Sequence, residues 1–168
     1  MHDHGRNGGV ATGLRTGPGN EAVAVSLWRS APLPSGFRRQ WHEELHSLSE
    51  LAALRARLRV TLTGSPTVID LQREHWSERL VLIADELASN ALRHGEPPVR
   101  TVLSSAGRQW LLTVSDASLE VPPAPAQGRD PGLGGFGLYL VADLSLRHGW
   151  CREPGAKTVW AVVEADQD

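Results

Sequence analysis

The spacing of apolar residues changes along this chain, and the change restricts the folds that it can adopt. Between Ser47 and His94 apolar residues recur at intervals of three and four, the spacing of amphipathic helices. From Val99 to Asp116 they recur at about every second position, the spacing of strands with one buried face. Elements segregated in this way predict an α+β two-layer sandwich, with helices packed on one face of a mostly antiparallel sheet.

The predicted elements follow the order β-α-α-β-β-loop-α-β-β. The expected helices run from Ser47 to about Gly64, from Glu74 to His94 and from Phe136 to Leu146. The expected strands are Gln40–His46, Val99–Ser104, Trp110–Asp116, Trp150–Glu153 and Lys157–Val163. A loop rich in proline and glycine, Ala117–Leu133, follows the third strand, and a loop of this length inside a domain is usually functional.

The length of 168 residues predicts one domain. The first 36 residues are rich in Gly, Ser, Pro and Asn, and their one short apolar stretch is Ala22–Trp28. Because so short a stretch buries little surface, we expect a mobile N-terminal tail at residues 1–37. The domain is then placed at 38–164 and a short C-terminal tail at 165–168.

Charge and cysteine content limit the partners and the compartment. The chain has 17 basic and 19 acidic side chains, and a net charge of −2 argues against direct binding of nucleic acid. Its one cysteine, Cys151, cannot form an internal disulfide, which favours a reducing compartment. No apolar run is long enough for a membrane span. We therefore expect a cytoplasmic protein that does not bind membranes.

Three short motifs carry candidate chemistry. Glu86 and Asn90 lie four residues apart, so they project from one stripe of the second helix, either as part of a site or as a solvated polar face. Asp116 ends a strand, where it either accepts a hydrogen bond from a buried amine or caps the strand exit. The glycine-rich segment 132–138 precedes an apolar helix and either brings backbone N–H groups to phosphate oxygens or acts as a hinge.

These motifs, in this order, resemble those of the GHKL ATPases, a superfamily with histidine-kinase-like ATPase domains. The segment Glu86–Gly95 resembles the N-box, Asp116-Ala117-Ser118 the first glycine box, and Gly134–Gly137 the second. Lys157-Thr158-Val159-Trp160 is similar to the closing strand. The resemblance covers residues 38–164, and the short chain is most similar to the small anti-sigma-factor serine/threonine kinases.

The resemblance implies an ATP and Mg²⁺ site and assigns roles to its residues. Glu86 would orient or deprotonate the attacking hydroxyl, Asn90 would coordinate Mg²⁺, and Asp116 would bind the adenine amine. The segment around the phosphates would comprise Gly132, Gly134, Gly135, Phe136, Gly137 and Leu138. Thr158 would support the adenine end. The implied partners are a sigma factor and a small anti-anti-sigma protein, with a possible homodimer.

Two residues depart from the family pattern or from expectation. Ser118 stands where the first glycine box usually has glycine, which affects the adenine pocket. Lys157 is the only lysine of the chain, and we expect it to be exposed at a strand start, with contact to nucleotide phosphate as the alternative.

Two other functions are considered. His42-Glu43-Glu44-Leu45 resembles a histidine phosphoacceptor box, but only 48 positions separate His42 from Asn90, too few for two long dimerisation helices. The second alternative is a regulatory binding module, with or without nucleotide, that has no kinase activity.

Overall fold

The computed structural model describes residues 28–64, 75–119, 123 and 136–166. Its five strands form one antiparallel sheet in the order β1-β2-β3-β5-β4. The strands are β1 (Arg38–Leu45), β2 (Val99–Ala106), β3 (Gln109–Asp116), β4 (Arg147–Glu153) and β5 (Ala156–Glu164). The helices are a 3₁₀ turn, η1 (Leu48–Glu50), and α2 (Leu51–Thr63), α3 (His75–His94) and α4 (Gly137–Leu144).

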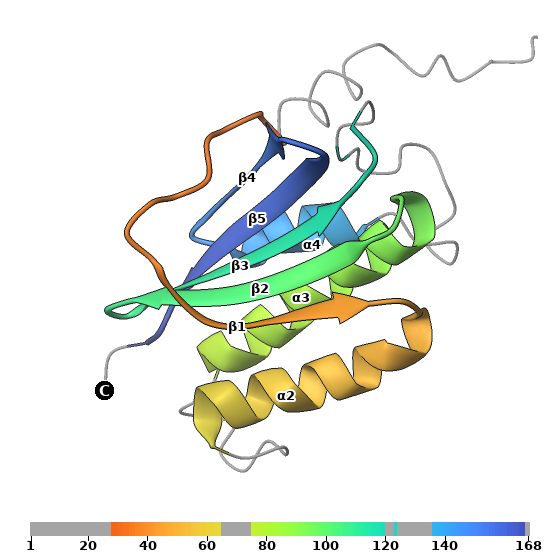
Figure 1. Cartoon of the computed structure of the whole chain (residues 1–168). Coiled ribbons are helices and arrows are strands. Elements are labelled where there is room, and N and C mark those ends of the chain that lie inside the picture. Colours follow the sequence, from red (N-terminus) through yellow and green to blue (C-terminus); the bar gives the residue numbers. More distant parts are fainter. Residues whose placement is uncertain (1–27, 65–74, 120–122, 124–135, 167–168) are drawn as a thin grey trace, which may run out of the picture.

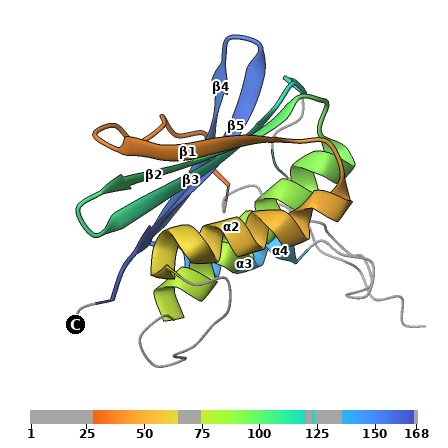
Figure 2. The same cartoon turned by 60° about the horizontal axis from the view of Figure 1, so that its bottom comes forward.

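The three α-helices cover one face of the sheet, as Figures 1 and 2 show. Helix α3 lies at the centre of this layer and packs against both α2 and α4. Its buried side chains, which include Leu80, Ile83 and Leu87, join sheet residues such as Leu112 and Val114 in one core. Burial of each such side chain contributes about 1.5–3 kcal/mol. The predicted α+β two-layer sandwich is therefore confirmed.

Strand β5 is buried on both of its faces. Val159, Ala161 and Val163 belong to the core under the helices. The alternate residues Trp160 and Val162 form a second buried cluster with Leu111. This alternation means that odd-numbered residues of β5 face the helices and even-numbered residues face the other side of the sheet.

The described part of the N-terminal segment, residues 28–37, packs on the domain, contrary to the tail expected at 1–37. Trp28 is only 4% exposed, and its Nε1 donates to the carbonyl oxygen of Leu138 at 3.2 Å. The Trp150 Nε1 donates in turn to the Trp28 carbonyl at 3.2 Å. Ser30 forms a parallel bridge to Trp150, so residues 29–31 lie along the outer edge of β4. Residues 1–27 lie outside the described part of the chain.

Several element boundaries differ by one to three residues from the sequence prediction, among them those between the last helix and β4. The last helix ends at Leu144 rather than Leu146, and Ser145, in an extended conformation, caps it. Strand β4 then begins at Arg147, before the expected Trp150. Gly149 allows this longer strand because a Cβ there would lie 2.7 Å from the Trp160 ring.

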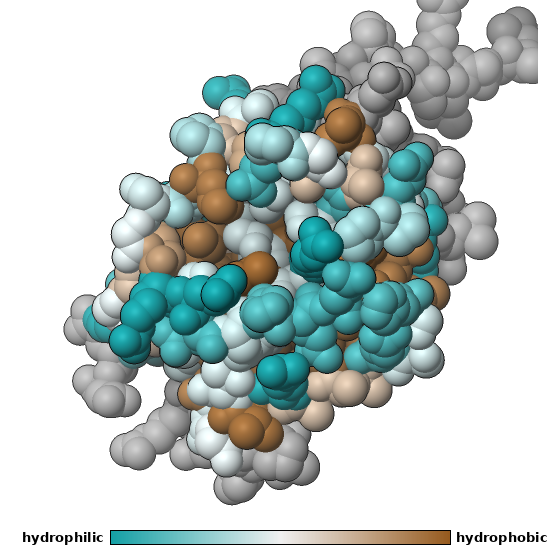
Figure 3. Space-filling view, viewed as in Figure 1, coloured by the Kyte–Doolittle hydropathy of each residue, from teal (hydrophilic) through white to brown (hydrophobic). Residues whose placement is uncertain are grey.

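The exposed hydrophobic residues are scattered over the described surface. On the face of the molecule in Figure 3 they form several separate patches between hydrophilic residues. None of the described helices is both long and apolar enough to cross a bilayer.

Trp28→Ala is expected to lower the free energy of unfolding by about 3–5 kcal/mol, because it opens a cavity and removes a buried hydrogen bond. Urea unfolding followed by tryptophan fluorescence and circular dichroism measures this loss. Val60→Ala, at a side chain that is 48% exposed, is the matched control and should change stability by less than about 1 kcal/mol. Equal stability of Trp28→Ala and the wild type would contradict the packed position of residues 28–37.

Candidate functional site

The C-terminal end of α3 is joined to the end of β3. The Gly95 N–H donates to the Ala91 carbonyl at 2.8 Å, and the Ala117 N–H donates to the Glu96 carbonyl at 2.8 Å. A Cβ at Gly95 would lie 2.6 Å from Asp116 Cγ. Glycine is therefore required at position 95 by close approach to the Asp116 side chain, since its backbone is not among the positive-φ glycines.

Asp116 lies in a small buried network with Ser118 and Lys157. Its Oδ1 accepts hydrogen bonds from the Ser118 backbone N–H at 2.8 Å and from the Ser118 hydroxyl at 2.7 Å. Lys157 Nζ is 3.3 Å from Asp116 Oδ2 and 3.2 Å from Ser118 Oγ. The carboxylate thus caps the strand exit, as one of the two sequence interpretations proposed, and also forms a buried ion pair.

Lys157, and not Thr158, is the β5 residue beside Asp116. The two strands pair Asp116 directly with Lys157, and Lys157 is 7% exposed, so the expectation of an exposed lysine is wrong. Thr158 is on the opposite face of β5, where its Oγ1 donates to Glu153 Oε2 at 2.5 Å. The structure therefore does not bring Thr158 to the Asp116 side chain.

The N-terminus of α4 lies against Glu86. A Cβ at Gly137 would overlap Glu86 Oε2, so glycine at this position lets the first turn of α4 approach the carboxylate. Phe136, which precedes the helix, provides no side-chain cap for its N–H groups. Such N–H groups, together with the helix dipole, favour anionic ligands.

Burial raises the pKa of the Glu86 carboxyl above its ordinary value. The neighbouring negative charge of Asp85 raises this pKa further, while the positive charge of Arg93 lowers it. Asp85 itself forms an ion pair with Arg55 of α2. A carboxylate with a raised pKa is a stronger base than an ordinary one, which suits a general base.

Three positions in the C-terminal part of α3 and directly after it mark the extent of the site. Gly95, which follows α3, adjoins Asp116, Asn90 is partly buried five residues earlier, and Glu86 adjoins α4. The nine residue steps from Glu86 to Gly95 correspond to roughly 14 Å at the rise of an α-helix. Asp116 and the N-terminus of α4 thus lie beside opposite ends of this stretch of chain, and the N-terminus of α4 is suited to anionic ligands.

The remaining predicted residues divide into two groups. Gly132, Gly134 and Gly135 lie outside the described residues. Phe136 is 57% exposed directly before α4. Leu138 is buried in the core, with its carbonyl bonded to Trp28, so its side chain serves packing.

The carboxamide of Asn90 fits a magnesium ion that is shared with phosphates. Within the described ranges, no group of three or more His, Cys, Asp or Glu side chains could hold a metal ion. Mg²⁺ needs few protein oxygens when phosphates and water complete its coordination. The Asn90 carboxamide would supply such an oxygen, and it lies one helical turn from Glu86, the residue that Gly137 of α4 approaches.

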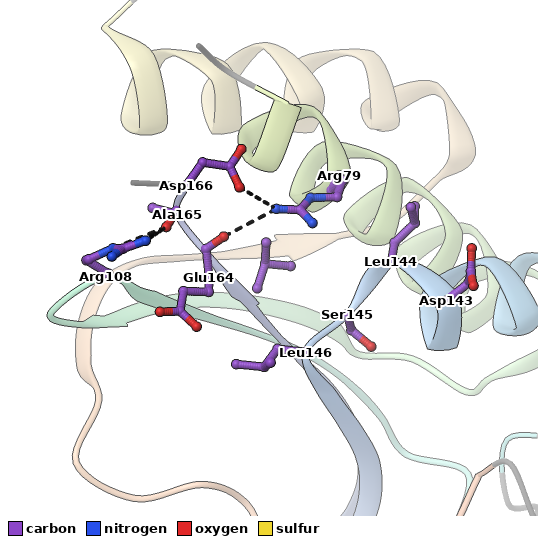
Figure 4. A pocket seen from close by; sticks show the side chains of 10 residues that line it. Arg79, Arg108, Asp143, Leu144, Ser145, Leu146, Glu164, Ala165 and Asp166 are labelled. Atoms are coloured by element: carbon purple, nitrogen blue, oxygen red, sulfur yellow. Dashed lines mark hydrogen bonds and ion pairs between the residues drawn. The ribbon is translucent and has the colours of Figure 1, made fainter. Parts of the chain in front are cut away.

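A separate cavity of about 550 Å³ contains none of these residues. Figure 4 shows its lining, with Arg79 and Arg108 directed at the end of β5. Arg79 donates to Glu164 O at 3.4 Å and to Asp166 Oδ1 at 3.2 Å. Arg108 Nε donates to Ala165 O at 3.2 Å. These arginines hold the C-terminal end of the last strand, so we assign this cavity a structural role.

Comparison with known proteins identifies the family. A model described as the histidine kinase-like ATPase domain matches residues 48–163, more than half of the chain. The chain therefore belongs to this family, and membership supports an ATP-binding regulatory function, usually with Mg²⁺. Among solved structures, the Acinetobacter baumannii histidine kinase AdeS is similar at 13% identity and a TM-score of 0.41, over 88% of this chain and 77% of that chain. No curated protein sequence matches the chain.

Gly95→Ala is expected to destabilise the chain by about 1–3 kcal/mol, the usual cost of overpacking. Because the Gly95 backbone is not left-handed, this loss reports the clash with Asp116 and Ala91 O rather than backbone strain. Urea unfolding measures it. A variant as stable as the wild type would show that Asp116 does not lie against the end of α3.

Glu86→Gln is expected to raise stability at neutral pH. At Glu86 the folded state binds a proton more tightly than the unfolded state, because the pKa of this carboxyl is raised on folding. The contribution of Glu86 to the free energy of unfolding is therefore complete at low pH. It is lost as the pH rises above the unfolded pKa of 4.5 and through the raised folded pKa. Melting temperatures at pH 4 and pH 7.5 measure the effect. The variant should gain over the wild type only at the higher pH.

Glu78→Gln is the matched control for this measurement. Glu78 lies on the same helix and accepts two hydrogen bonds from Arg59, at 2.8 and 3.0 Å. Its loss should lower stability at pH 7.5 rather than raise it. A Glu86→Gln variant that is also less stable at pH 7.5 would contradict the effect of burial on the Glu86 carboxyl.

Proposed function

We propose that this chain is an ATP-dependent regulatory kinase that transfers phosphate to a serine or threonine of a small anti-anti-sigma protein and also binds a sigma factor. The observation that carries the proposal is the position of the Glu86 carboxylate at the α4 N-terminus, one turn from Asn90. This arrangement places the Glu86 carboxylate, a candidate general base, beside a helix N-terminus that is suited to binding phosphates. Membership of the ATPase family supports the nucleotide.

Each residue then has a limited task. The α4 N–H groups and Asn90, through Mg²⁺, would neutralise and position the phosphates, and bound Mg²⁺ would stabilise the charge that develops during transfer. Glu86 would accept a hydrogen bond from the attacking hydroxyl and take its proton. Asp116, at the other end of α3, would accept a hydrogen bond from the adenine amine. Positioning and charge neutralisation supply most of the catalysis in phosphoryl transfer.

The position of His42 favours an acceptor on another protein. His42 lies within β1, paired with Val102 of β2, and β1 is a strand of the ATPase domain sheet itself. A phosphoacceptor histidine needs freedom to approach the nucleotide. A residue within the ladder of β1 lacks this freedom, so the proposal gives His42 no catalytic role.

One observation favours the second candidate, a regulatory binding module without kinase activity. Both oxygens of Asp116 are already engaged, Oδ1 by Ser118 and Oδ2 by Lys157. Adenine can bind at Asp116 only by displacing or sharing these contacts with Ser118 and Lys157. The two candidates differ in phosphate transfer, which is therefore the property to measure.

The test combines calorimetry with a transfer assay. We expect Mg-ATP to bind to the full chain and radioactive phosphate to pass from ATP to a candidate anti-anti-sigma protein. Glu86→Gln should lower transfer by roughly 100-fold or more, the usual contribution of a general base, with little change in ATP affinity. Glu78→Gln is the control and should transfer phosphate normally.

The outcomes separate the candidates. Binding without transfer would support the binding module. Transfer that is unchanged in Glu86→Gln would overturn the role of Glu86, and absence of any heat or thermal shift with Mg-ATP would overturn the kinase proposal.

A further inference from the structure

Lys157 is an unusual residue to find at this place. It is the only lysine of the chain, and its side chain is 9% exposed beside an Asp116 side chain that is 4% exposed. A buried ion pair loses much of its attraction to desolvation, so it is a weak source of stability. Lysine in a buried position at the end of a candidate binding site therefore points to recognition of a ligand.

The Asp116–Lys157 pair offers a hydrogen-bond acceptor and a donor side by side. The carboxylate accepts, the ammonium donates, and the two groups are 3.3 Å apart. The Watson–Crick edge of adenine has the complementary arrangement, because its exocyclic amine donates and the adjacent ring nitrogen N1 accepts. Enzymes that bind an isolated base often recognise it through this edge.

We propose that Lys157 is a base-recognition residue, which donates a hydrogen bond to N1 of adenine while Asp116 accepts one from the exocyclic amine. This inference rests on the proposed nucleotide site and adds a residue to it. Lys157 stands on the β5 face that points to the helices, directly opposite Asp116 in the strand register, whereas Thr158 points away. Lysine is thus the β5 side chain in reach of a base held by Asp116.

Ser118 allows Lys157 to change its hydrogen-bond acceptor to adenine without leaving a buried polar group unpaired. In the structure Lys157 Nζ donates to Ser118 Oγ at 3.2 Å, and the same hydroxyl donates to Asp116 Oδ1 at 2.7 Å. When adenine binds, Lys157 Nζ stops donating to Ser118 Oγ and donates to N1 instead. Ser118 still orients the carboxylate through its hydroxyl and its backbone N–H at 2.8 Å.

Nucleotide analogues test this contact on the unmodified protein. Calorimetry compares ATP with 1-deaza-ATP, which lacks N1, and with 7-deaza-ATP, which lacks a nitrogen on the other edge of the base. Loss of a hydrogen bond from a charged donor should weaken 1-deaza-ATP by about tenfold or more, while 7-deaza-ATP should bind about as tightly as ATP. Equal affinities for ATP and 1-deaza-ATP would overturn the role of Lys157 alone.

A variant of Lys157, measured with the same two nucleotides, completes a double-change cycle of side chain and base. Lys157→Met should bind ATP more weakly and should no longer distinguish ATP from 1-deaza-ATP, and circular dichroism confirms that it is folded. Tighter ATP binding by Lys157→Met would mean that lysine competes with the base for Asp116, which also overturns the inference. If this variant does not fold, the analogue series on the wild type still decides the question. Failure of ATP itself to bind would instead overturn the proposed function.

Discussion

The antiparallel pairing of β3 with β5 is the interaction on which the candidate site depends. This pairing sets Asp116 opposite Lys157 and Val114 opposite Val159. The same register therefore fixes the buried ion pair and the core under α3. A shift of one residue would turn Lys157 to the other face of the sheet and expose Val159 and Ala161 to the wrong neighbours. The hydrophobic core thus maintains the register that the polar network needs.

Helix α3 packs on the sheet and carries the polar residues of the candidate site. Its apolar stripe, with Leu80, Ile83 and Leu87, fixes the helix on the sheet. The adjacent stripe carries Asn90 and, one turn before it, Glu86, whose carboxylate lies against the start of α4. Two glycines make the close approaches at either end, Gly95 against Asp116 and Gly137 against Glu86.

The order and type of the elements could be predicted from sequence because they depend on local periodicity. The packing of residues 28–37 could not, since Trp28 bonds to Leu138 across 110 positions and no local pattern encodes such a contact. Among the site residues, Glu86, Asn90 and Asp116 are indicated by helix spacing and strand position, whereas their roles come from family resemblance and stay predictions. Lys157 was misjudged because β5 is apolar on both faces, which hides the alternation that assigns Lys157 to the helix side.

We propose that one nucleotide lies along α3, with its base at Asp116 and Lys157 and its phosphates at the start of α4. A crystal structure of the full chain with Mg²⁺ and a non-hydrolysable ATP analogue tests this claim most directly. We expect adenine within hydrogen-bond distance of both Asp116 and Lys157, and the terminal phosphate near Gly137 and Glu86. A nucleotide bound instead in the cavity lined by Arg79 and Arg108 would contradict it.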